Sequence, residues 1–473
     1  MQTIDNTPLK DFEGLFEIIH LFESTNKITC KLLNGKSLGF YGKAILSRIK
    51  NNFTVELTVL KNLSPFFDRD FGKIEDFELQ IQGIQYLIKD AHIISNSIKS
   101  NSIKSNSTKV TVKFYTFQKN KSNFDYFSHL LILPSAEDIS FPFYLEDTRS
   151  YKAKERCIMG LVSCTIDSFN FDLFIFSKEG KCYLAVDSTN EMELTIFQNY
   201  AYSILIGFGY ITGSFVQNIG FYFSYDRHKK LQGIQVQGKR KSVYTLLSPI
   251  YKKPYGVFQN QDYHEKYYDI IRGLTSSELS KLCQLINDSE EIKVIILLIL
   301  ESCAATQIIQ PAGFAVALEG FSAFIKKEIE KEREKSSPKL SSKILRDLKM
   351  VLTNNKEELG DSFDFFSKKI EQINQPANKD TLLKPFEYLK IPINELDKQT
   401  IDHRNDLMHG RDLKSIFEGK NNDRYRFSAS LRLYTLLSAL ILKYVGFDNR
   451  VINHPKRSDS LNIATKEEPF RQI

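Results

Sequence analysis

The chain has 473 residues, 42% of them hydrophobic, which is enough for sizeable cores and predicts two or three domains. Its formal net charge of +7 is a mild excess that is compatible with an RNA partner but does not indicate one by itself. The six cysteines form no C-x-x-C pair, which argues against a zinc or redox motif and favours reduced thiols in the core.

Two further features bear on the compartment. The first residues lack the basic head and apolar core of a secretion signal. The most apolar run, residues 294–300, is far shorter than the ~20 residues of a membrane span. We therefore expect a cytoplasmic protein with no membrane partner.

The first half of the chain shows the period-two alternation of β-strands. Strands are predicted at residues 27–33, 37–41, 53–60, 77–88, 110–117, 157–166, 171–177 and 181–186. Asn34-Gly35 and Glu179-Gly180 are expected to form hairpin turns. A tandem N-S-I-K-S repeat at residues 96–105 is expected to lengthen a solvated hairpin loop.

The pattern then changes to helical spacing over residues 192–206. The glycine-rich, aromatic stretch 207–223 does not precede a helix as a phosphate-binding loop would, so we interpret it as a helix end that runs into a strand. Residues 1–246 thus predict one β-rich domain, and residues 247–272, with two prolines, are the best linker candidate.

Everything beyond the linker predicts helices. They are expected at residues 276–286 behind a Thr275–Glu278 capping box, 291–310, 312–335 behind Pro311, 340–352, 362–373 and 424–445. Residues 291–310 are apolar nearly all round and predict a buried central helix, whereas the charged run 326–335 predicts a solvated face. We expect a helical domain over residues 273–450 and a loose polar tail over 451–473. The predicted fold class is α+β multidomain.

One further predicted helix, residues 395–413, carries the pattern R-N-x-x-x-H in Arg404, Asn405 and His409. Ile401, Arg404 and Met408 recur at helical spacing, which places Arg404 on the apolar stripe. Asn405 and His409 are four residues apart and are expected on one face.

These residue types suit the cleavage of RNA. RNA carries a 2′-hydroxyl beside each scissile phosphate, and an imidazole can take that proton or protonate the leaving oxygen. A guanidinium can hold the extra negative charge on phosphorus, and the amide of Asn405 can orient the phosphate or the imidazole. The expected products are a cyclic phosphate and a 5′-hydroxyl end, with no metal or other cofactor.

The motif in its helical setting resembles the HEPN superfamily, whose ribonucleases carry R-(N/D/H)-x-x-x-H on a late helix of a helical domain. The β-rich half, with G-F-G-Y-I-T-G after its helix, resembles the N-terminal domain of ApeA-type anti-phage HEPN proteins. The resemblance implies a metal-independent endoribonuclease, with tRNA among the possible substrates. It also implies an abortive-infection effector that responds to an unknown phage-derived trigger.

The resemblance carries two further expectations. HEPN ribonucleases usually work as homodimers that bring two motif helices together, so Arg404 and His409 are expected to be completed by a second copy. An acidic residue on an earlier helix sometimes assists, and Glu319 is the candidate. His403, next to Arg404, lies off the motif.

Other classes of protein remain as alternatives. A non-catalytic HEPN-like scaffold for dimerisation, or for binding RNA or protein, is the main one. A nucleotidyltransferase or metallo-nuclease lacks support, because the sequence has no convincing cluster of His and Cys ligands and no P-loop.

Overall fold

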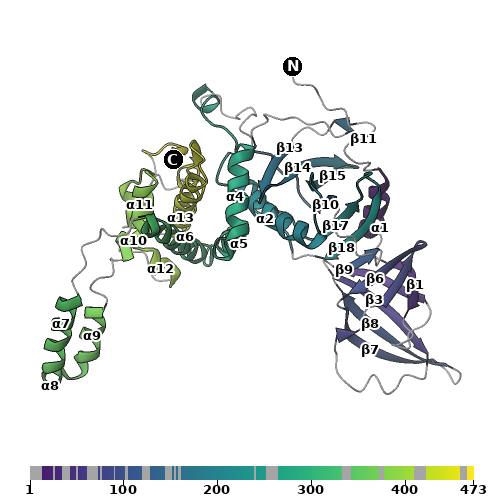
Figure 1. Ribbon diagram of the computed structural model, residues 1–473, viewed down its shortest axis with the longest axis horizontal. Helices are drawn as coiled ribbons and strands as arrows, with labels where there is room; N and C mark the ends of the chain where they lie inside the picture. The colour runs from purple at the N-terminus through teal and green to yellow at the C-terminus, as the bar shows by residue number, and fades with distance from the viewer. Residues whose placement is uncertain are drawn as a thin grey trace. The chain divides into compact units, whose positions relative to one another are not determined.

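The computed structural model describes residues 13–24, 27–34, 43–49, 52–60, 73–74, 77–89, 91–101, 105–114, 116–119, 128–143, 152–153, 156–157, 161–238, 241–251, 265–332, 342–371, 378–409, 422–458 and 466–473. The contacts within the chain divide it into two compact units (Figure 1). Unit 1 is Met1–Ala304 and unit 2 is Ala305–Ile473.

Unit 1 is built on a large antiparallel sheet, drawn in Figure 1 as two adjoining sections. The first section contains β1 (Lys27–Asn34), β2 (Lys43–Ile49), β3 (Asn52–Leu60), β4 (Lys73–Ile74), β5 (Phe77–Ile81), β6 (Ile84–Lys89), β7 (Ala91–Asn101), β8 (Ser105–Phe114) and β9 (Thr116–Lys119). The second contains β10 (Ser128–Ser135), β13 (Leu161–Ile166), β14 (Phe169–Lys178), β15 (Lys181–Ser188), β17 (Ile219–Tyr225) and β18 (Leu231–Gly238). β9 joins the sections, because it pairs with β6 on one side and β18 on the other.

The remaining strands described in unit 1 form two short ladders. β11 (Lys152–Ala153) pairs with β12 (Arg156–Cys157), and β16 (Ser214–Phe215) pairs with β19 (Val243–Tyr244).

One face of the sheet packs on helix α1 (Glu13–Ser24), which the sequence analysis did not predict. The ring of Phe16 lies 5.4 Å from that of Tyr183 in the second section. The ring of Phe22 lies 6.3 Å from that of Phe53 in the first section. Aromatic pairs at these centroid separations add to the burial of apolar area, so α1 ties both sections into one core.

Helix α2 (Leu194–Thr212) supplies a second core, through Phe197, whose ring lies 6.3 Å from that of Tyr222 in β17. α2 continues six residues past the predicted end, into the start of the glycine-rich stretch, and stops at Gly213 with φ 72°. Gly207 lies against the next helix, because a Cβ there would sit 2.9 Å from the Sγ of Cys283. This close packing explains the glycine without a ligand.

The predicted strands are confirmed in part. Residues 77–88 form two strands, β5 and β6, because Gln82 and Gly83 both have positive φ and turn the chain. The described part of the N-S-I-K-S repeat lies in paired β7 and β8 and not in a loop, so its first half forms an arm of the hairpin. The predicted strand 37–41 lies outside the described residues.

The division between the units lies further along the chain than the sequence predicted. Helices α4 (Ser276–Asp288) and α5 (Glu290–Cys303) were expected in the helical domain, but they belong to unit 1. α4 packs on α2 and β13, where Ser280 Oγ accepts a 2.9 Å hydrogen bond from the amide of Thr165. Within the predicted linker, residues 252–264 lie outside the described residues, whereas Ile250 and Ile271 are buried.

The predicted burial of α5 on all sides is wrong. Its buried apolar side chains, among them Ile292, Ile296 and Ile299, lie on one face, while Val294 is 55% exposed. The predicted capping box of α4 is confirmed, with hydrogen bonds in both directions between Thr275 and Glu278.

Unit 2 is a set of helices around α6 (Gln310–Glu332) and α13 (Asn422–Tyr444). Its other described elements are α7 (Ser342–Asn354), α8 (Lys356–Leu359), η2 (Gly360–Ser362), α9 (Phe363–Glu371), α10 (Asn378–Tyr388), α11 (Glu395–Asp402), α12 (Arg404–Met408), β20 (Arg450–Ile452), α14 (His454–Arg457) and β21 (Phe470–Gln472). Phe314 meets Tyr434 at 5.2 Å between ring centroids, and the leucines of α13 between 433 and 442 are fully buried as predicted. α10, which contains Pro385, was not predicted.

Residues 451–458 and 466–473, the described parts of the C-terminal segment, are ordered, contrary to the expected loose tail. β20 pairs with β21, and Val451, Phe470 and Ile473 are buried. Lys443 of α13 donates a 3.0 Å hydrogen bond to the backbone oxygen of Ile473. The part of the segment that the structure describes therefore belongs to the core of unit 2.

Two broader expectations can be compared with the described residues. The thiols of Cys30, Cys164, Cys182 and Cys283 are free and buried, as expected of reduced core cysteines. No helix among the described residues is long and apolar enough to cross a membrane.

Candidate active site

The predicted motif helix is two short helices separated by a break at His403. Asn394 caps the start of α11, and its capping box with Asp397 satisfies the first backbone amides. α11 ends where the backbone amide of His403 donates to the carbonyl oxygens of Gln399 and Ile401. Arg404 then opens α12 and His409 closes it, so the single helix over 395–413 is corrected at this point, and residues 410–413 lie outside the described part.

Arg404 lies in the interior, as its place on the apolar stripe predicted. It is 5% exposed, and Ile401 and Leu407 beside it are also buried. Its Nε donates a 2.7 Å hydrogen bond to Glu319 Oε1, and its Nη1 donates a 3.1 Å bond to the carbonyl oxygen of Ile401. Since a guanidinium has five N–H donors, these two bonds fix its orientation and leave others for a further acceptor.

The structure therefore joins Arg404 with Glu319, the acidic residue named as a possible assistant. Glu319 comes from α6, 85 positions earlier in the chain, and its side chain is 37% exposed. The ion pair thus has one buried partner and one that reaches solvent.

Asn405 and His409 lie on the exposed side of α12. The backbone amide of His409 donates a 3.0 Å hydrogen bond to the carbonyl oxygen of Asn405, which sets them one turn apart. The described residues provide no hydrogen bond between the His409 ring and the Arg404 guanidinium. One chain therefore brings Arg404 and Glu319 into contact and leaves the imidazole open to solvent.

His403 has a different environment from His409. Its Nδ1 lies 3.3 Å from Asp406 Oδ2, three residues along the chain. This local pair provides a reason for a histidine at the break that does not involve a substrate.

Sequence reasoning missed a buried charge network behind the motif. Asp397 of α11 is fully buried and accepts hydrogen bonds from Arg432 at 2.9 Å and Arg471 at 2.6 Å. Arg432 also bonds Glu467 at 2.8 Å, and Asn394 donates to Glu467 at 2.6 Å. An arginine in the apolar run of α13 was the one sequence signal for it, because a buried charge needs partners.

The network shifts the ionisation of both acids. Burial alone would raise the pKa of Asp397, but the cations of Arg471 and Arg432 outweigh it and hold that pKa below its usual value. Burial would likewise raise the pKa of Glu467, and its bonds to Arg432 and Asn453 lower it instead. Both carboxyl groups are therefore charged at neutral pH and anchor the start of α11.

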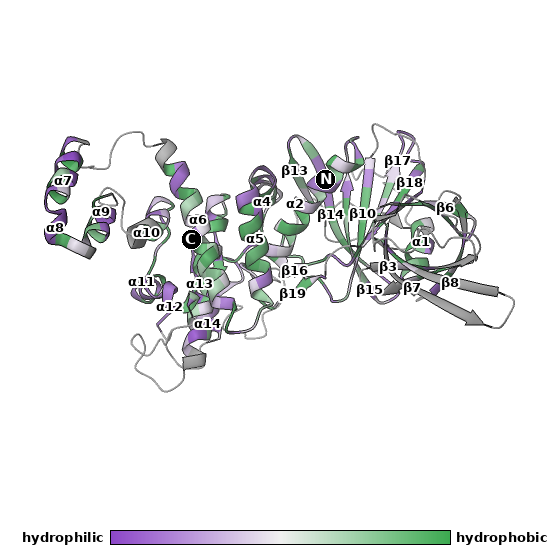
Figure 2. Ribbon diagram, turned by 90° about the horizontal axis from the view of Figure 1, so that it is seen from below, coloured by the Kyte–Doolittle hydropathy of each residue, from purple (hydrophilic) through white to green (hydrophobic). Residues whose placement is uncertain are grey.

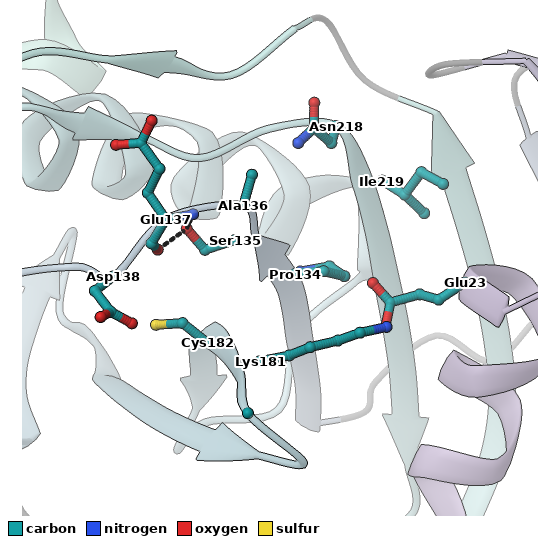
Figure 3. A pocket seen from close by; sticks show the side chains of 11 residues that line it. Glu23, Pro134, Ser135, Ala136, Glu137, Asp138, Lys181, Cys182, Asn218 and Ile219 are labelled. Carbon is teal, nitrogen blue, oxygen red and sulfur yellow. Dashed lines mark hydrogen bonds and ion pairs between the residues drawn. The ribbon is translucent and has the colours of Figure 1, made fainter.

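A second candidate site is a pocket of about 460 Å³ in unit 1, shown in Figure 3. It is lined by Glu23, Pro134, Ser135, Ala136, Glu137, Asp138, Gly180, Lys181, Cys182, Asn218 and Ile219. Lys181 lies 3.3 Å from Glu23, which reduces its charge as seen by a ligand. Burial raises the pKa of the Cys182 thiol, with Asp138 adding to the effect, so the thiol is protonated at neutral pH and a poor nucleophile.

His129, a buried histidine of β10, has no ring nitrogen available for catalysis. Its Nδ1 lies 2.9 Å from Ser224 Oγ and its Nε2 lies 2.8 Å from the carbonyl oxygen of Met192. Both ring nitrogens are thus bonded, as expected of a core histidine.

Among the residues that the structure describes, no cluster of three or more His, Cys, Asp or Glu side chains could hold a metal ion. Comparisons of the chain with protein-family models, with curated proteins and with solved structures returned no match. The assignment of a function therefore depends on the R-N-x-x-x-H motif and on the geometry around Arg404.

Proposed function

We propose that unit 2 is a HEPN-type endoribonuclease that needs no metal, and that Arg404, Asn405 and His409 form its site. The observation that carries the proposal is the ion pair of Arg404 with Glu319, at 2.7 Å, on the short helix that also presents the exposed Asn405 and ends at the exposed His409. A guanidinium fixed in this way is preorganised for the charge that develops on a phosphate in the transition state.

In this proposal each residue has one role. His409 takes the proton from the 2′-hydroxyl, or gives one to the leaving 5′-oxygen. Arg404 stabilises the pentacoordinate phosphorus through N–H donors that Glu319 and Ile401 leave unused. Asn405 orients the phosphate, and Glu319 acts as a positioning residue that holds the guanidinium.

A second copy completes the site in this account. Within one chain His409 is solvent-exposed and makes no bond to the Arg404 side chain among the described residues. Two α12 helices brought together would place the imidazole of one copy near the guanidinium of the other. The proposal thus includes a homodimer in which the imidazole and the guanidinium of one site come from different copies.

Unit 1 in this proposal senses a phage-derived trigger or positions the RNA, and cleavage halts growth of the infected cell. This assignment rests on the resemblance of the β-rich half to ApeA-type proteins. The order of the two units along the chain supports it, since a unit built on a sheet is followed by a helical unit.

A second candidate function, a non-catalytic scaffold, is favoured by the burial of Arg404. At 5% exposure, with two bonds made inside the chain, Arg404 also suits a purely structural ion pair. In that case His409 and Asn405 would be ordinary surface residues.

Cleavage of RNA by the purified full-length protein separates the two candidates. We expect wild-type cleavage to persist in EDTA, and His409→Ala and Arg404→Met each to lower the rate by roughly 10²–10⁴-fold. His403→Ala is the matched control, one residue from Arg404, and should cleave like the wild type. Equal rates for His409→Ala and the wild type, or complete loss in EDTA, would reject the ribonuclease mechanism.

A further inference from the structure

The positive charge of the chain is concentrated in the first section of the sheet. Residues 27–119 hold fifteen lysines and arginines and seven aspartates and glutamates, a net +8, whereas the whole chain has +7. Most of this charge belongs to five strands that are neighbours in the order β1, β2, β3, β8 and β7, and Figure 2 shows the last three side by side. These strands hold one acidic residue, Glu56, against seven basic ones: Lys27, Lys31, Lys43, Arg48, Lys99, Lys109 and Lys113.

The five strands have one apolar and one polar face. The apolar face packs in the core with α1, and its members are buried: Ala44, Leu46, Phe53, Val55, Val112 and Phe114. Because residues alternate between the two faces along a strand, every second position belongs to the opposite face. We call that opposite face, with Lys27, Lys31 and Lys113, the basic face. Lys27 and Lys31 are exposed, and Lys113 is partly exposed.

The strand register arranges the basic face in rows that run across the sheet. One row crosses all five strands, each residue paired with the next, and consists of Lys27, Ser47, Thr54, Lys113 and His92. Four residues along β1, Lys31 pairs with Lys43, and Lys109 is likewise four positions from Lys113 on β8. With strands about 4.8 Å apart and about 3.4 Å per residue, these positions cover an area of about 19 by 14 Å.

The pairing of Lys31 with Lys43 is unfavourable for the sheet itself. The two residues are directly opposite each other on neighbouring strands, and like charges in this position destabilise a sheet. Lys31 has no ion-pair partner among the described residues. An anion held over the two strands would offset the repulsion, so this arrangement favours an anionic partner on the basic face.

The basic face lacks the aromatic side chains on which single-stranded bases stack. The five strands contain no tyrosine or tryptophan, and their two phenylalanines, Phe53 and Phe114, stack on each other in the core at 5.8 Å between ring centroids. A double helix presents its phosphates outward and needs no such ring. A duplex therefore suits this face better than an unpaired strand.

The residues beside the lysines also distinguish a nucleic acid from a membrane. Thr29, Ser47 and Thr111 bring exposed or partly exposed hydroxyl groups to the basic face. Ile45, at 36%, is the most exposed large apolar residue described there. Membrane surfaces are bound by sets of apolar side chains beside basic ones, whereas hydroxyl and ammonium groups donate to phosphate oxygens. The composition of the face favours a nucleic acid.

We propose that the basic face binds the phosphate backbone of a nucleic-acid duplex and does not read its sequence. Lys27, Lys31 and Lys113 contact phosphates, and the hydroxyl groups beside them contact the sugar–phosphate backbone. The duplex is RNA, and this choice of RNA over DNA rests on the proposed function. The binding itself involves neither Arg404 nor His409.

Fluorescence anisotropy with a labelled RNA duplex of about 20 base pairs tests the proposal. The full-length protein is used in the His409→Ala background, which keeps the probe intact and makes the result independent of cleavage. We expect a Kd of about 1–100 µM near physiological salt, the same for different sequences. K27Q/K31Q should raise the Kd at least about fivefold and reduce the slope of log Kd against log salt by about two. K229Q/K230Q, at two exposed lysines of the turn between β17 and β18, is the matched control and should bind like its parent.

Two further measurements separate a lost contact from a lost fold. K27R/K31R keeps the charge and should bind like its parent, and the urea midpoint of K27Q/K31Q should equal or exceed that of its parent, because Lys31 no longer opposes Lys43. No binding at about 100 µM, or equal Kd values for K27Q/K31Q and K229Q/K230Q, would overturn the proposal. Tighter binding to a single strand of the same length, or to vesicles of phosphatidylserine and phosphatidylcholine, would overturn it in favour of that partner. Tighter binding to the matching DNA duplex would overturn the choice of RNA.

Discussion

Arg404 and Glu319 form an ion pair whose partners are unequally exposed. Arg404 is 5% exposed, so loss of its carboxylate partner would leave a buried cation whose one other hydrogen bond to a described residue goes to the carbonyl oxygen of Ile401. Glu319 is 37% exposed on its side chain, so water can replace the guanidinium when Arg404 is removed. Removal of Glu319 and removal of Arg404 should therefore lower the free energy of unfolding by different amounts.

We predict that Glu319→Ala destabilises the fold more than Arg404→Met does. Glu319→Ala should lower the free energy of unfolding by about 2 kcal/mol, because it leaves Arg404 unpaired. Arg404→Met, which keeps the apolar stem, should lower it by less than about 1 kcal/mol. Urea denaturation of both variants measures this difference. A larger loss for Arg404→Met would show that the buried charge, and not its shape, holds α12 in place.

The sequence predicted a good part of this residue arrangement. The apolar spacing of Ile401 and Arg404 predicted a buried guanidinium, and the resemblance to HEPN ribonucleases named Glu319 as an acidic residue that could assist. The contact itself joins positions 85 residues apart. Nothing in local spacing determines such a pairing, so it needed the three-dimensional packing of α6 on α12.

At the scale of elements, the start of the motif is held by the C-terminal segment. Arg471 of β21 bonds Asp397 and the carbonyl oxygen of Pro392, and Glu467 bonds Asn394. The cap of α11 is thus fixed by side chains from the end of the chain. α11 in turn leads through His403 to Arg404, so the segment positions the candidate site indirectly.

We predict that acid weakens the contacts by which the C-terminal segment holds the start of α11. The pKa values of Asp397 and Glu467 are lowered in the folded chain, so their stabilisation is fully present above the unfolded values of about 4. It is lost as the pH falls below about 4 and through the lower folded values, by an order of 1 kcal/mol for each carboxylate.

Hydrogen exchange of the α11 backbone amides, followed between pH 7 and pH 3 and corrected for intrinsic rates, measures this change. Protection should fall below about pH 4 in the wild type. Arg471→Met should reduce the pH dependence, because one of the two cations that lower the Asp397 pKa is gone. Protection that is constant down to pH 3 would contradict a role of Asp397 and Glu467 in holding the start of α11.

Elements with strong local patterns were predicted best. The period-two strands, the leucines of α13 and the capping box of α4 follow from residues close together in sequence. The order of residues 466–473 was missed, because it depends on partners far along the chain. The break at His403 was also missed. α1 was missed because its burial depends on strands that follow it.

At the scale of the whole molecule, the division at Ala304 gives each unit a core of its own. The helical faces of α4 that pack in unit 1 include Leu279, Leu282 and Cys283, all with no exposed surface. The sequence predicted a boundary before α4, because helical periodicity shows that a helix has an apolar face but not which neighbour covers it.

Two fragments test the division. Residues 305–473 should fold when expressed alone, because α6 and α13 pack together within unit 2. Residues 273–473 should associate non-specifically, because they expose the face of α4 that unit 1 buries. Light scattering and circular dichroism of both fragments compare them. A well-behaved longer fragment beside an unfolded shorter one would place the boundary where the sequence predicted it.

The most direct measurement for the central claim is sequencing of RNA 5′ ends from phage-infected bacteria that express the wild type, His409→Ala or His403→Ala. The account predicts new 5′-hydroxyl ends with the wild type and with His403→Ala, and none with His409→Ala. Identical end profiles in all three would contradict it and leave unit 2 as a binding scaffold.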